Sequence, residues 1–244
     1  MRIVILIIVL YKCLLGSEFE ISLTKDILLS GSGVLASGIT LFTDPKNKSV
    51  GSKSKINNLD EFFMNGFHEI PDIYSTYTAY YLVASPLLFV LDRKYNELKT
   101  YGIMYAETLL LTTGVKELLK NSFSRIRPYA YFKNIPDNFD DEYNKSFPSG
   151  HTAYSFASAG FITSILISDY EPSFTRNSII VGSYLLASSV GITRVTSGSH
   201  FFTDVISGAI LGTTTGYLIP FLHKKNCSLS LIPKYDGIEI VYNL

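Results

Sequence analysis

Three short segments of the chain combine cationic side chains, two histidines and one carboxylate at fixed spacings. These segments are Lys120-x6-Arg127-Pro128, Pro148-Ser149-Gly150-His151 and Arg194-x5-His200-x3-Asp204. Fixed positive charge stabilises a phosphoryl group during transfer, and imidazoles can act as nucleophile, acid or base. The segments therefore predict a pocket that binds a phosphate group and cleaves it from its ester.

The cations match the charge that develops in this reaction. During phosphoryl transfer, negative charge spreads over the equatorial oxygens of the transferred group. Arg127 and Arg194 can hold these oxygens as bidentate forks, and Lys120 can act as a point charge. Ser149 and Gly150 stand where an apolar run begins, so their backbone N–H groups are predicted to open a helix. A helix N-terminus is itself an anion-binding site.

The two histidines and the aspartate have separate predicted roles. His200 and Asp204 are four residues apart and are predicted to share one face of a helix. The carboxylate can then accept the proton of one ring nitrogen and leave the other nitrogen free to attack phosphorus. His151 remains to protonate the departing oxygen and later to activate water. We therefore predict that His200, His151 and Asp204 are catalytic.

In these segments the chain resembles the type-2 phosphatidic acid phosphatase superfamily, which includes lipid phosphate phosphatases, bacterial class A acid phosphatases and vanadium haloperoxidases. The family signature reads K-x6-RP, PSGH and SR-x5-H-x3-D, and the chain departs from it only at Thr193, where the family has Ser. The resemblance extends over residues 109–216. It implies a phosphohistidine at His200, oriented by Asp204, with His151 as the acid and with no metal or other cofactor. The phosphate-binding residues that it implies are Lys120, Arg127, Ser149, Gly150 and Arg194.

Two nearby cations, Lys116 and Arg125, have no position in this signature. Long basic side chains after apolar helices usually keep their charged ends in water. We therefore predict that both lie at the surface or behind the phosphate-binding residues.

The 244-residue chain has the composition of a single apolar-rich domain. It is 47% hydrophobic and carries 21 basic and 21 acidic residues, so its net charge is zero. A neutral chain has no bulk attraction for nucleic acid, and no such partner is predicted. Residues 1–17 are predicted to be a secretory signal peptide, with an ordinary apolar first helix or strand as the alternative. Residues 18–226 then form a helical phosphatase domain, and residues 227–244 form a tail.

Charge-poor runs of helical length predict an all-α fold. The runs cover residues 27–43, 73–91, 100–115, 152–168, 177–193 and 205–222. They predict a six-helix up-and-down bundle. In such a bundle Lys120 ends the third helix, His151 begins the fourth, Arg194 follows the fifth and His200 opens the sixth. These ends meet on one side, which places the active site at one end of the bundle.

Three further segments have distinct patterns. Residues 59–70 have apolar side chains at helical spacing after a cap at Asn58, and predict a helix that either packs on the core or lies in a membrane surface. Residues 129–145 predict a lid over the site, or alternatively a solvated loop. The tail alternates in hydropathy on both sides of the turn signal Asp236-Gly237, which predicts a small β-hairpin.

The apolar runs are at the short end of what a transmembrane helix needs, about 20 residues. We predict an enzyme that is embedded in, or seated on, a membrane of the cell envelope, with its active site toward the periplasm. Its predicted function is metal-independent hydrolysis of a lipid phosphate or pyrophosphate. A soluble periplasmic acid phosphatase that acts on small phosphomonoesters is the alternative, and a vanadate-dependent haloperoxidase is a remote one.

Overall fold

The computed structural model of the chain describes residues 19–40, 42, 56–90, 95–132, 143–225, 228–234 and 237–243. The predicted signal peptide and most of the predicted lid lie outside these residues, so both stay predictions.

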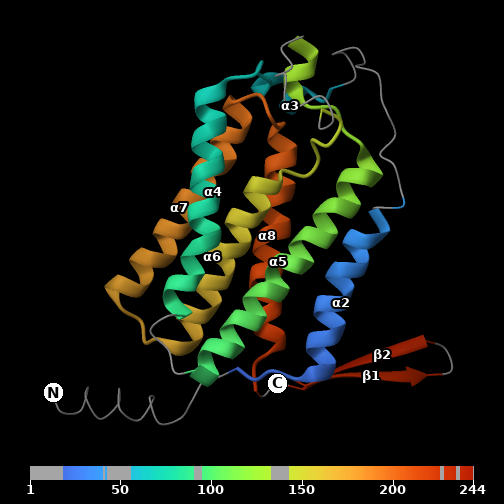
Figure 1. Cartoon of the computed structure of the whole chain (residues 1–244), viewed down its shortest axis with the longest axis vertical. Helices are drawn as coiled ribbons and strands as arrows, with labels where there is room; N and C mark the ends of the chain where they lie inside the picture. The colour runs from blue at the N-terminus through green and yellow to red at the C-terminus, as the bar shows by residue number, and fades with distance from the viewer. Residues whose placement is uncertain are drawn as a thin grey trace.

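The described residues are mainly helical, which confirms the all-α class. The long helices are α2 (Leu23–Thr40), α4 (Glu69–Val90), α5 (Tyr95–Phe123), α6 (Gly150–Asp169), α7 (Phe174–Thr196) and α8 (Phe202–Leu222). A short helix α3 (Asn58–Phe63) and a 3-10 helix η2 (Pro128–Phe132) lie at one end of the bundle, at the top of Figure 1. The predicted total of six helices stays a prediction, because residues 1–18 lie outside the described part of the chain.

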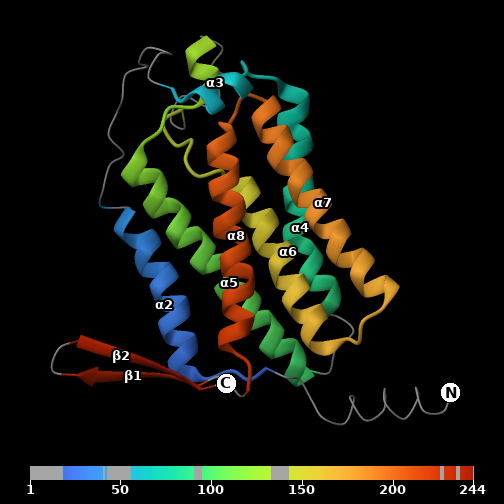
Figure 2. The ribbon, with the colours of Figure 1, turned by 180° about the vertical axis from the view of Figure 1, so that it is seen from behind.

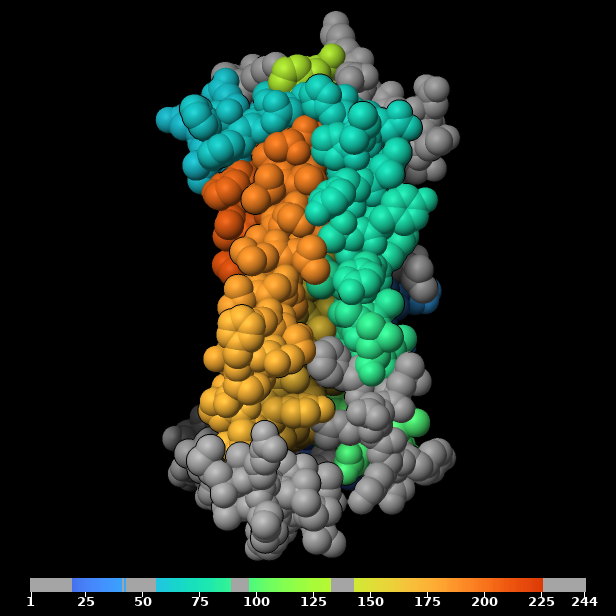
Figure 3. All heavy atoms as spheres, turned by 90° about the vertical axis from the view of Figure 1, so that its left-hand side faces the viewer, coloured from blue at the N-terminus to red at the C-terminus, as the bar shows by residue number. Residues whose placement is uncertain are grey.

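Successive long helices run in opposite directions, so alternate helix ends meet at the same end of the bundle. Helices α6 and α8 lie at the centre, with α4 and α7 on one side and α2 and α5 on the other, as both ribbon views show (Figures 1 and 2). Figure 3 shows α4 and α7 side by side along the elongated molecule. Helices α4, α6 and α8 begin on the side of the bundle where α3 lies, and α5 and α7 finish there.

Glycines on α8 allow the two central helices to approach closely. A Cβ atom at Gly212 would overlap the carbonyl oxygen of Ala153 and lie 2.7 Å from the amide nitrogen of Ala157. A Cβ atom at Gly208 would lie 2.6 Å from the carbonyl oxygen of Ser149. The small residues therefore fix the start of α6 against the start of α8, which is where the predicted catalytic residues lie.

The outer faces of the bundle are rich in apolar side chains. Exposed examples are Ile27, Leu28 and Leu35 on α2, Leu87 and Leu88 on α4, Val181, Leu185 and Ile192 on α7, and Ile206 and Ile210 on α8. The interior in turn includes buried polar side chains such as Thr108, Thr112 and Ser158. By length and composition, α7 and α8 could each cross a membrane.

The segment before α4 differs from its prediction. Helix α3 has only six residues and is capped by Asn57, whose side chain accepts a hydrogen bond from the amide of Asp60. Its apolar side chains do not pack on the core, since Phe62 is 80% exposed. Phe63 stacks on Phe202 at the start of α8, with ring centroids 5.1 Å apart. Of the predicted apolar side chains, only Phe67 packs on buried residues in the described part of the chain, namely Ile126, Tyr129 and Ala130. Helix α3 itself is therefore a surface helix, and it covers the start of α8.

Two strands follow the bundle. They are β1 (Ser228–Lys234) and β2 (Gly237–Asn243), which pair antiparallel with Ser228 opposite Asn243 and Lys234 opposite Gly237. The two residues between them lie outside the described residues, so the hairpin turn stays a prediction.

Candidate active site

The predicted site residues converge from five separate segments. Lys120 lies in the last turn of α5, His151 in the first turn of α6, Arg194 in the last turn of α7 and Asp204 in the first turn of α8. These helix ends meet at the end of the bundle that carries α3. The side chains of Arg127, Arg194, His200 and Asp204 are almost fully buried, and His151 is partly exposed. Of these side chains, His151 is therefore the most accessible to solvent.

His200 does not open a helix, in contrast with the prediction. It lies in the turn between α7 and α8, two residues before α8 begins. The turn depends on Gly198, whose φ of +72° is the left-handed conformation that favours glycine. A Cβ atom there would also overlap the carbonyl oxygens of Gly66 and Asn65. This turn carries the imidazole into the buried end of the bundle.

The hydrogen bond that orients His200 comes from the backbone. Its Nδ1 lies 2.7 Å from the carbonyl oxygen of Ser146, whereas the nearest carboxylate oxygen of Asp204 is 3.8 Å away. The predicted direct hydrogen bond between His200 and Asp204 is therefore not formed. Asp204 acts on the segments around the ring instead, because its Oδ2 accepts hydrogen bonds from the hydroxyl of Ser146, at 2.6 Å, and the amide of Phe201, at 2.9 Å.

This arrangement fixes the tautomer of His200. A carbonyl oxygen can only accept a hydrogen bond, so Nδ1 carries the proton and Nε2 carries the lone pair. Nε2 faces Nη1 of Arg127 at 3.4 Å. Burial, followed by the charges of Arg127 and Arg194, lowers the pKa of His200 well below its usual value. The imidazole is therefore neutral, with an unprotonated nitrogen beside a guanidinium.

Arg194 is held by a group that the sequence analysis missed. Its Nη1 donates to Oδ1 of Asp72, at 2.6 Å, and to the hydroxyl of Ser75, at 3.2 Å. The same oxygen of Asp72 accepts a hydrogen bond from Ser199, at 2.6 Å. Among the residues that the structure describes, no hydrogen-bond partner faces the buried Nε of Arg194. The guanidinium is thus anchored at one nitrogen and keeps another N–H donor for an anion.

Lys116 lies beside the phosphate-binding residues and not at the surface. It is 8% exposed, its Nζ is 2.6 Å from Oε1 of Glu117, and it lies over the ring of Tyr154. A Cβ atom at Gly150 would lie 3.2 Å from Cδ of Lys116 and 4.0 Å from Nζ of Lys120. The glycine therefore lets two lysines approach the start of α6, and the surface alternative for Lys116 is wrong.

Arg125 joins three elements behind the site. Its Nη1 lies 2.5 Å from Oδ1 of Asp204 and 2.8 Å from the hydroxyl of Thr203, and its Nη2 lies 2.6 Å from Oδ2 of Asp60. Although burial raises the pKa of Asp60, the hydrogen bonds from Arg125 and Thr203 lower it overall. Asp60 comes from α3, so this network fastens α3 to the start of α8. Of the two predicted positions for Arg125, the one behind the phosphate-binding residues is confirmed.

Ser149 makes a different contribution from the predicted one. Its amide donates to the carbonyl oxygen of Asp204 at 3.0 Å, and its hydroxyl pairs with that of Thr152 at 2.9 Å. That amide is therefore engaged within the protein and cannot also bind an anion. Gly150 is the first residue of α6, where backbone N–H groups have no partner in the preceding turn. The anion-binding character of this helix start thus begins at Gly150.

Taken together, the site surrounds two neutral imidazoles with a surplus of positive charge. Burial, followed by the charges of Arg194 and Arg127, lowers the pKa of His151 to about 3. Asp204 and Asp60 are paired with Arg125, and Asp72 with Arg194. Lys120 and His151 also act electrostatically on His200. A small group that carries two negative charges matches such a pocket, because desolvated cations stabilise an anion far more strongly than exposed ones do.

Comparisons with known proteins point to one family. The family model described as the PAP2 superfamily matches residues 101–227, which are 127 of the 244 residues. Lipid phosphate phosphatase 2 of Arabidopsis thaliana is 29% identical over 136 residues, which cover 46% of each chain. Lipid A 1-phosphatase of Porphyromonas gingivalis is 32% identical over 123 residues, covering 49% of this chain and 24% of that protein. The crystal structure of Aquifex aeolicus LpxE matches 66% of this chain and 92% of its own at 26% identity, with a TM-score of 0.46. The chain thus spans less than half the length of the two curated relatives.

Proposed function

This chain belongs to the PAP2 superfamily, and we propose that it is a phosphatase that hydrolyses a lipid phosphate or pyrophosphate through a phosphohistidine intermediate. The observation that carries the proposal is the neutral His200, whose unprotonated Nε2 faces Arg127 among buried cations. A nucleophile needs a free lone pair, and its target needs fixed positive charge to offset the phosphate oxygens.

The proposed reaction has two steps. In the first, Nε2 of His200 attacks phosphorus and the bond from phosphorus to the leaving oxygen breaks. The negative charge of the bound phosphate offsets the cations that lower the pKa of His151, so His151 is protonated in the complex and gives the leaving oxygen its proton. The imidazole of His200 gains positive charge, which the carbonyl oxygen of Ser146 and the nearby carboxylate of Asp204 stabilise. In the second step, His151 takes a proton from water, the water oxygen attacks phosphorus, and the P–N bond breaks. Inorganic phosphate leaves and His200 returns to its neutral form.

In the proposed reaction, the cationic side chains stabilise the negative charge of the phosphate, as a metal ion does in many phosphatases. Lys120, Arg127 and Arg194 offset the charge on the phosphate oxygens, and Lys116 adds a fourth cation beside Gly150. Each needs only to be positioned, and the helix ends, Asp72 and Gly150 position them. We therefore propose that the chemistry at this site needs no metal ion.

A lipid substrate is supported by the outer surface of the bundle. Large apolar side chains are exposed on α2, α4, α7 and α8, and an apolar surface of this kind favours a lipid environment over water. Two of the matching relatives are themselves named as lipid phosphatases. We propose that the bundle is seated in a membrane of the cell envelope, with the His200 end toward the periplasm.

The substrate class can be tested with purified full-length protein in detergent. The panel comprises phosphatidic acid, a prenyl pyrophosphate, a lipid A phosphate and para-nitrophenyl phosphate, each assayed with and without EDTA. We expect a higher kcat/KM for a lipid substrate than for para-nitrophenyl phosphate. We also expect turnover to continue in EDTA, in an assay run at low temperature so that the protein stays folded. A preference for para-nitrophenyl phosphate, together with release from membranes in a carbonate wash, would favour the soluble acid phosphatase instead.

A further inference from the structure

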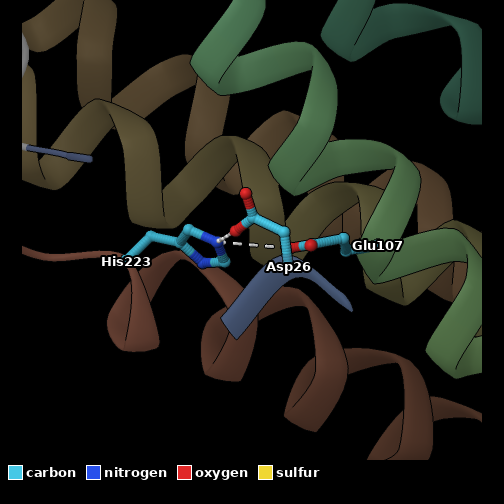
Figure 4. A group of neighbouring side chains, drawn as sticks. All are labelled: Asp26, Glu107 and His223. Atoms are coloured by element: carbon cyan, nitrogen blue, oxygen red, sulfur yellow. Dashed lines mark hydrogen bonds and ion pairs between the residues drawn. The ribbon is translucent and has the colours of Figure 1, made fainter. Parts of the chain in front are cut away.

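A second cluster of ionisable side chains lies at the opposite end of the bundle from His200. It consists of Asp26 in the first turn of α2, Glu107 in the middle of α5 and His223 at the end of α8 (Figure 4). Their ligand atoms lie within 4.8 Å of one another. Helix α8 separates His223 from His200, and 21 residues at about 1.5 Å each span roughly 30 Å. The cluster is therefore remote from the proposed chemistry.

The ring of His223 presents a lone pair to two carboxylates. Its Nδ1 lies 2.9 Å from the carbonyl oxygen of Ile219, which requires the proton on Nδ1 in the neutral ring. Its Nε2 lies 3.1 Å from Oδ1 of Asp26 and 3.3 Å from Oε2 of Glu107. In the neutral ring, Nε2 is thus a third acceptor that faces two carboxylate oxygens, an arrangement that a cation between them would stabilise.

Glu107 supplies an independent indication of a ligand. Its side chain is 1% exposed, and its Oε1 is 3.4 Å from the hydroxyl of Ser30. Its Oε2 is buried and has no hydrogen-bond partner among the residues that the structure describes. A buried carboxylate oxygen that accepts no hydrogen bond is costly, and this one points toward Asp26 and toward His223, whose Nε2 is 3.3 Å away (Figure 4).

We propose that Asp26, Glu107 and His223 bind one divalent transition-metal ion of the Zn²⁺ class, which fastens α2, α5 and α8 together. Bonds of about 2.0–2.2 Å around a tetrahedral ion place neighbouring ligand atoms roughly 3.3–3.6 Å apart, close to the observed 3.1 and 3.3 Å. Two carboxylates and a neutral imidazole carry a charge of −2, which a divalent ion neutralises. The hydrogen bond from Nδ1 to the Ile219 carbonyl is the support that metal-binding histidines commonly have.

The position of Asp26 provides an entry route. Its side chain is 18% exposed, whereas those of Glu107 and His223 are buried. An ion can therefore reach the cluster past Asp26, where water can complete its coordination. Asp26 and Glu107 are 81 residues apart in sequence, and Glu107 and His223 are 116 apart. The sequence therefore contains no short metal-binding motif that would identify them. The sequence analysis predicted no metal ligands in the chain, and the proposed site would be an exception to that prediction.

The test is Zn²⁺ binding to the metal-stripped full-length protein, followed by mass spectrometry for stoichiometry and by thermal unfolding. We expect one bound Zn²⁺ per chain and a rise in Tm, and Co²⁺ in its place should give the visible absorption of a tetrahedral site. Glu107→Gln and His223→Asn should lose the ion, and Asp26→Asn at the rim should bind it at least about tenfold more weakly with the fold intact.

Matched controls separate this site from other binding. Glu20→Gln and His68→Asn change exposed residues of the same types and should keep the full stoichiometry. His200→Asn should also keep it, because the catalytic histidines are not ligands. Stoichiometry well below one in the unsubstituted protein, or equal binding in Asp26→Asn, would overturn the proposal. A stability that depends on pH but not on Zn²⁺ would instead identify a proton between His223 and its two carboxylates, which also overturns it.

Discussion

Nη1 of Arg125 lies 2.5 Å from Oδ1 of Asp204, so the carboxylate of the signature motif is directly paired with a cation outside that motif. The other oxygen of Asp204 accepts from Ser146 and from the amide of Phe201. All these bonds connect backbone segments around His200. Asp204 therefore positions the segments that hold the imidazole and does not hold the imidazole itself.

Removal of Arg125 should destabilise the protein and lower kcat. Arg125→Gln leaves the buried carboxylates of Asp60 and Asp204 without their cation. Because loss of one member of a buried ion pair is strongly unfavourable, we expect a loss of about 3 kcal/mol in the free energy of unfolding. Denaturant unfolding of the purified variant and of the unsubstituted protein measures this difference in the free energy of unfolding.

Arg176→Gln is the matched control, because Arg176 is a partly exposed arginine whose hydrogen bonds to described residues go to Tyr170, Ser173 and Asn177 in its own segment. An Arg125→Gln protein as stable as Arg176→Gln would show that the network behind the site contributes nothing.

The acidic limb of the pH profile should depend on Arg127. Burial and the charge of Arg127 lower the pKa of His200, so the nucleophile stays neutral, and kcat/KM persists, at pH values well below 6.5. Arg127→Gln removes the positive charge, so the pKa of His200 rises and the acidic limb moves to higher pH. Arg127→Lys keeps the charge and should leave the limb in place.

The measurement is kcat/KM against pH with one substrate for all three proteins, so that titration of the substrate cancels. An acidic limb at the same pH in Arg127→Gln and in the unsubstituted protein would contradict the assignment of this limb to His200.

Asp72 should affect the binding of phosphate through Arg194. Asp72→Asn removes the negative charge that anchors Nη1 of Arg194, whereas its amide oxygen can still accept the hydrogen bond from Ser199. Hydrogen bonds to charged groups contribute about 1.5–3 kcal/mol, so we expect competitive inhibition by inorganic phosphate to weaken by roughly tenfold or more. Glu69→Gln changes an exposed acid in the same turn of α4 and should leave the inhibition constant unchanged. Equal constants for the two variants would exclude a role for Asp72.

The contact between α6 and α8 should not tolerate an added methyl group. In Gly212→Ala the new Cβ overlaps the Ala153 carbonyl, and overpacking of this kind costs about 1–3 kcal/mol of stability. Gly182 lies within α7, where a Cβ meets nothing within 4 Å, so Gly182→Ala should stabilise the protein by up to about 1 kcal/mol. Thermal unfolding measures the Tm of Gly212→Ala and of Gly182→Ala. Equal Tm values would show that the close approach of α6 and α8 does not contribute to stability.

The sequence predicts the convergence of the cations because an up-and-down bundle brings alternate helix ends together. Lys120, His151, Arg194 and Asp204 each lie within one turn of such an end. The wrong prediction for His200 has a physical cause. A spacing of four residues indicates one helix face, but Gly198 allows a turn that ends α7, and the helix begins again only after Phe201.

The supporting residues could not be predicted because nothing local marks them. Asp60 and Asp72 reach Arg125 and Arg194 across 65 and 122 residues of sequence. The acceptor for His200 is a backbone carbonyl, which every residue has, so side-chain types could not identify Ser146. Asp60 has the pattern of an ordinary first-turn acid, and only its complete burial distinguishes it.

The most direct test of the account is to trap the covalent intermediate. The enzyme is mixed with a substrate that carries ³²P in its phosphate, quenched in alkali and digested, and the labelled peptide is sequenced. Phosphohistidine survives alkali and is lost in acid, so we predict alkali-stable label on the peptide that contains His200, none in His200→Asn, and full labelling in His68→Asn. Label on any other residue, or steady turnover by His200→Asn, would contradict the account.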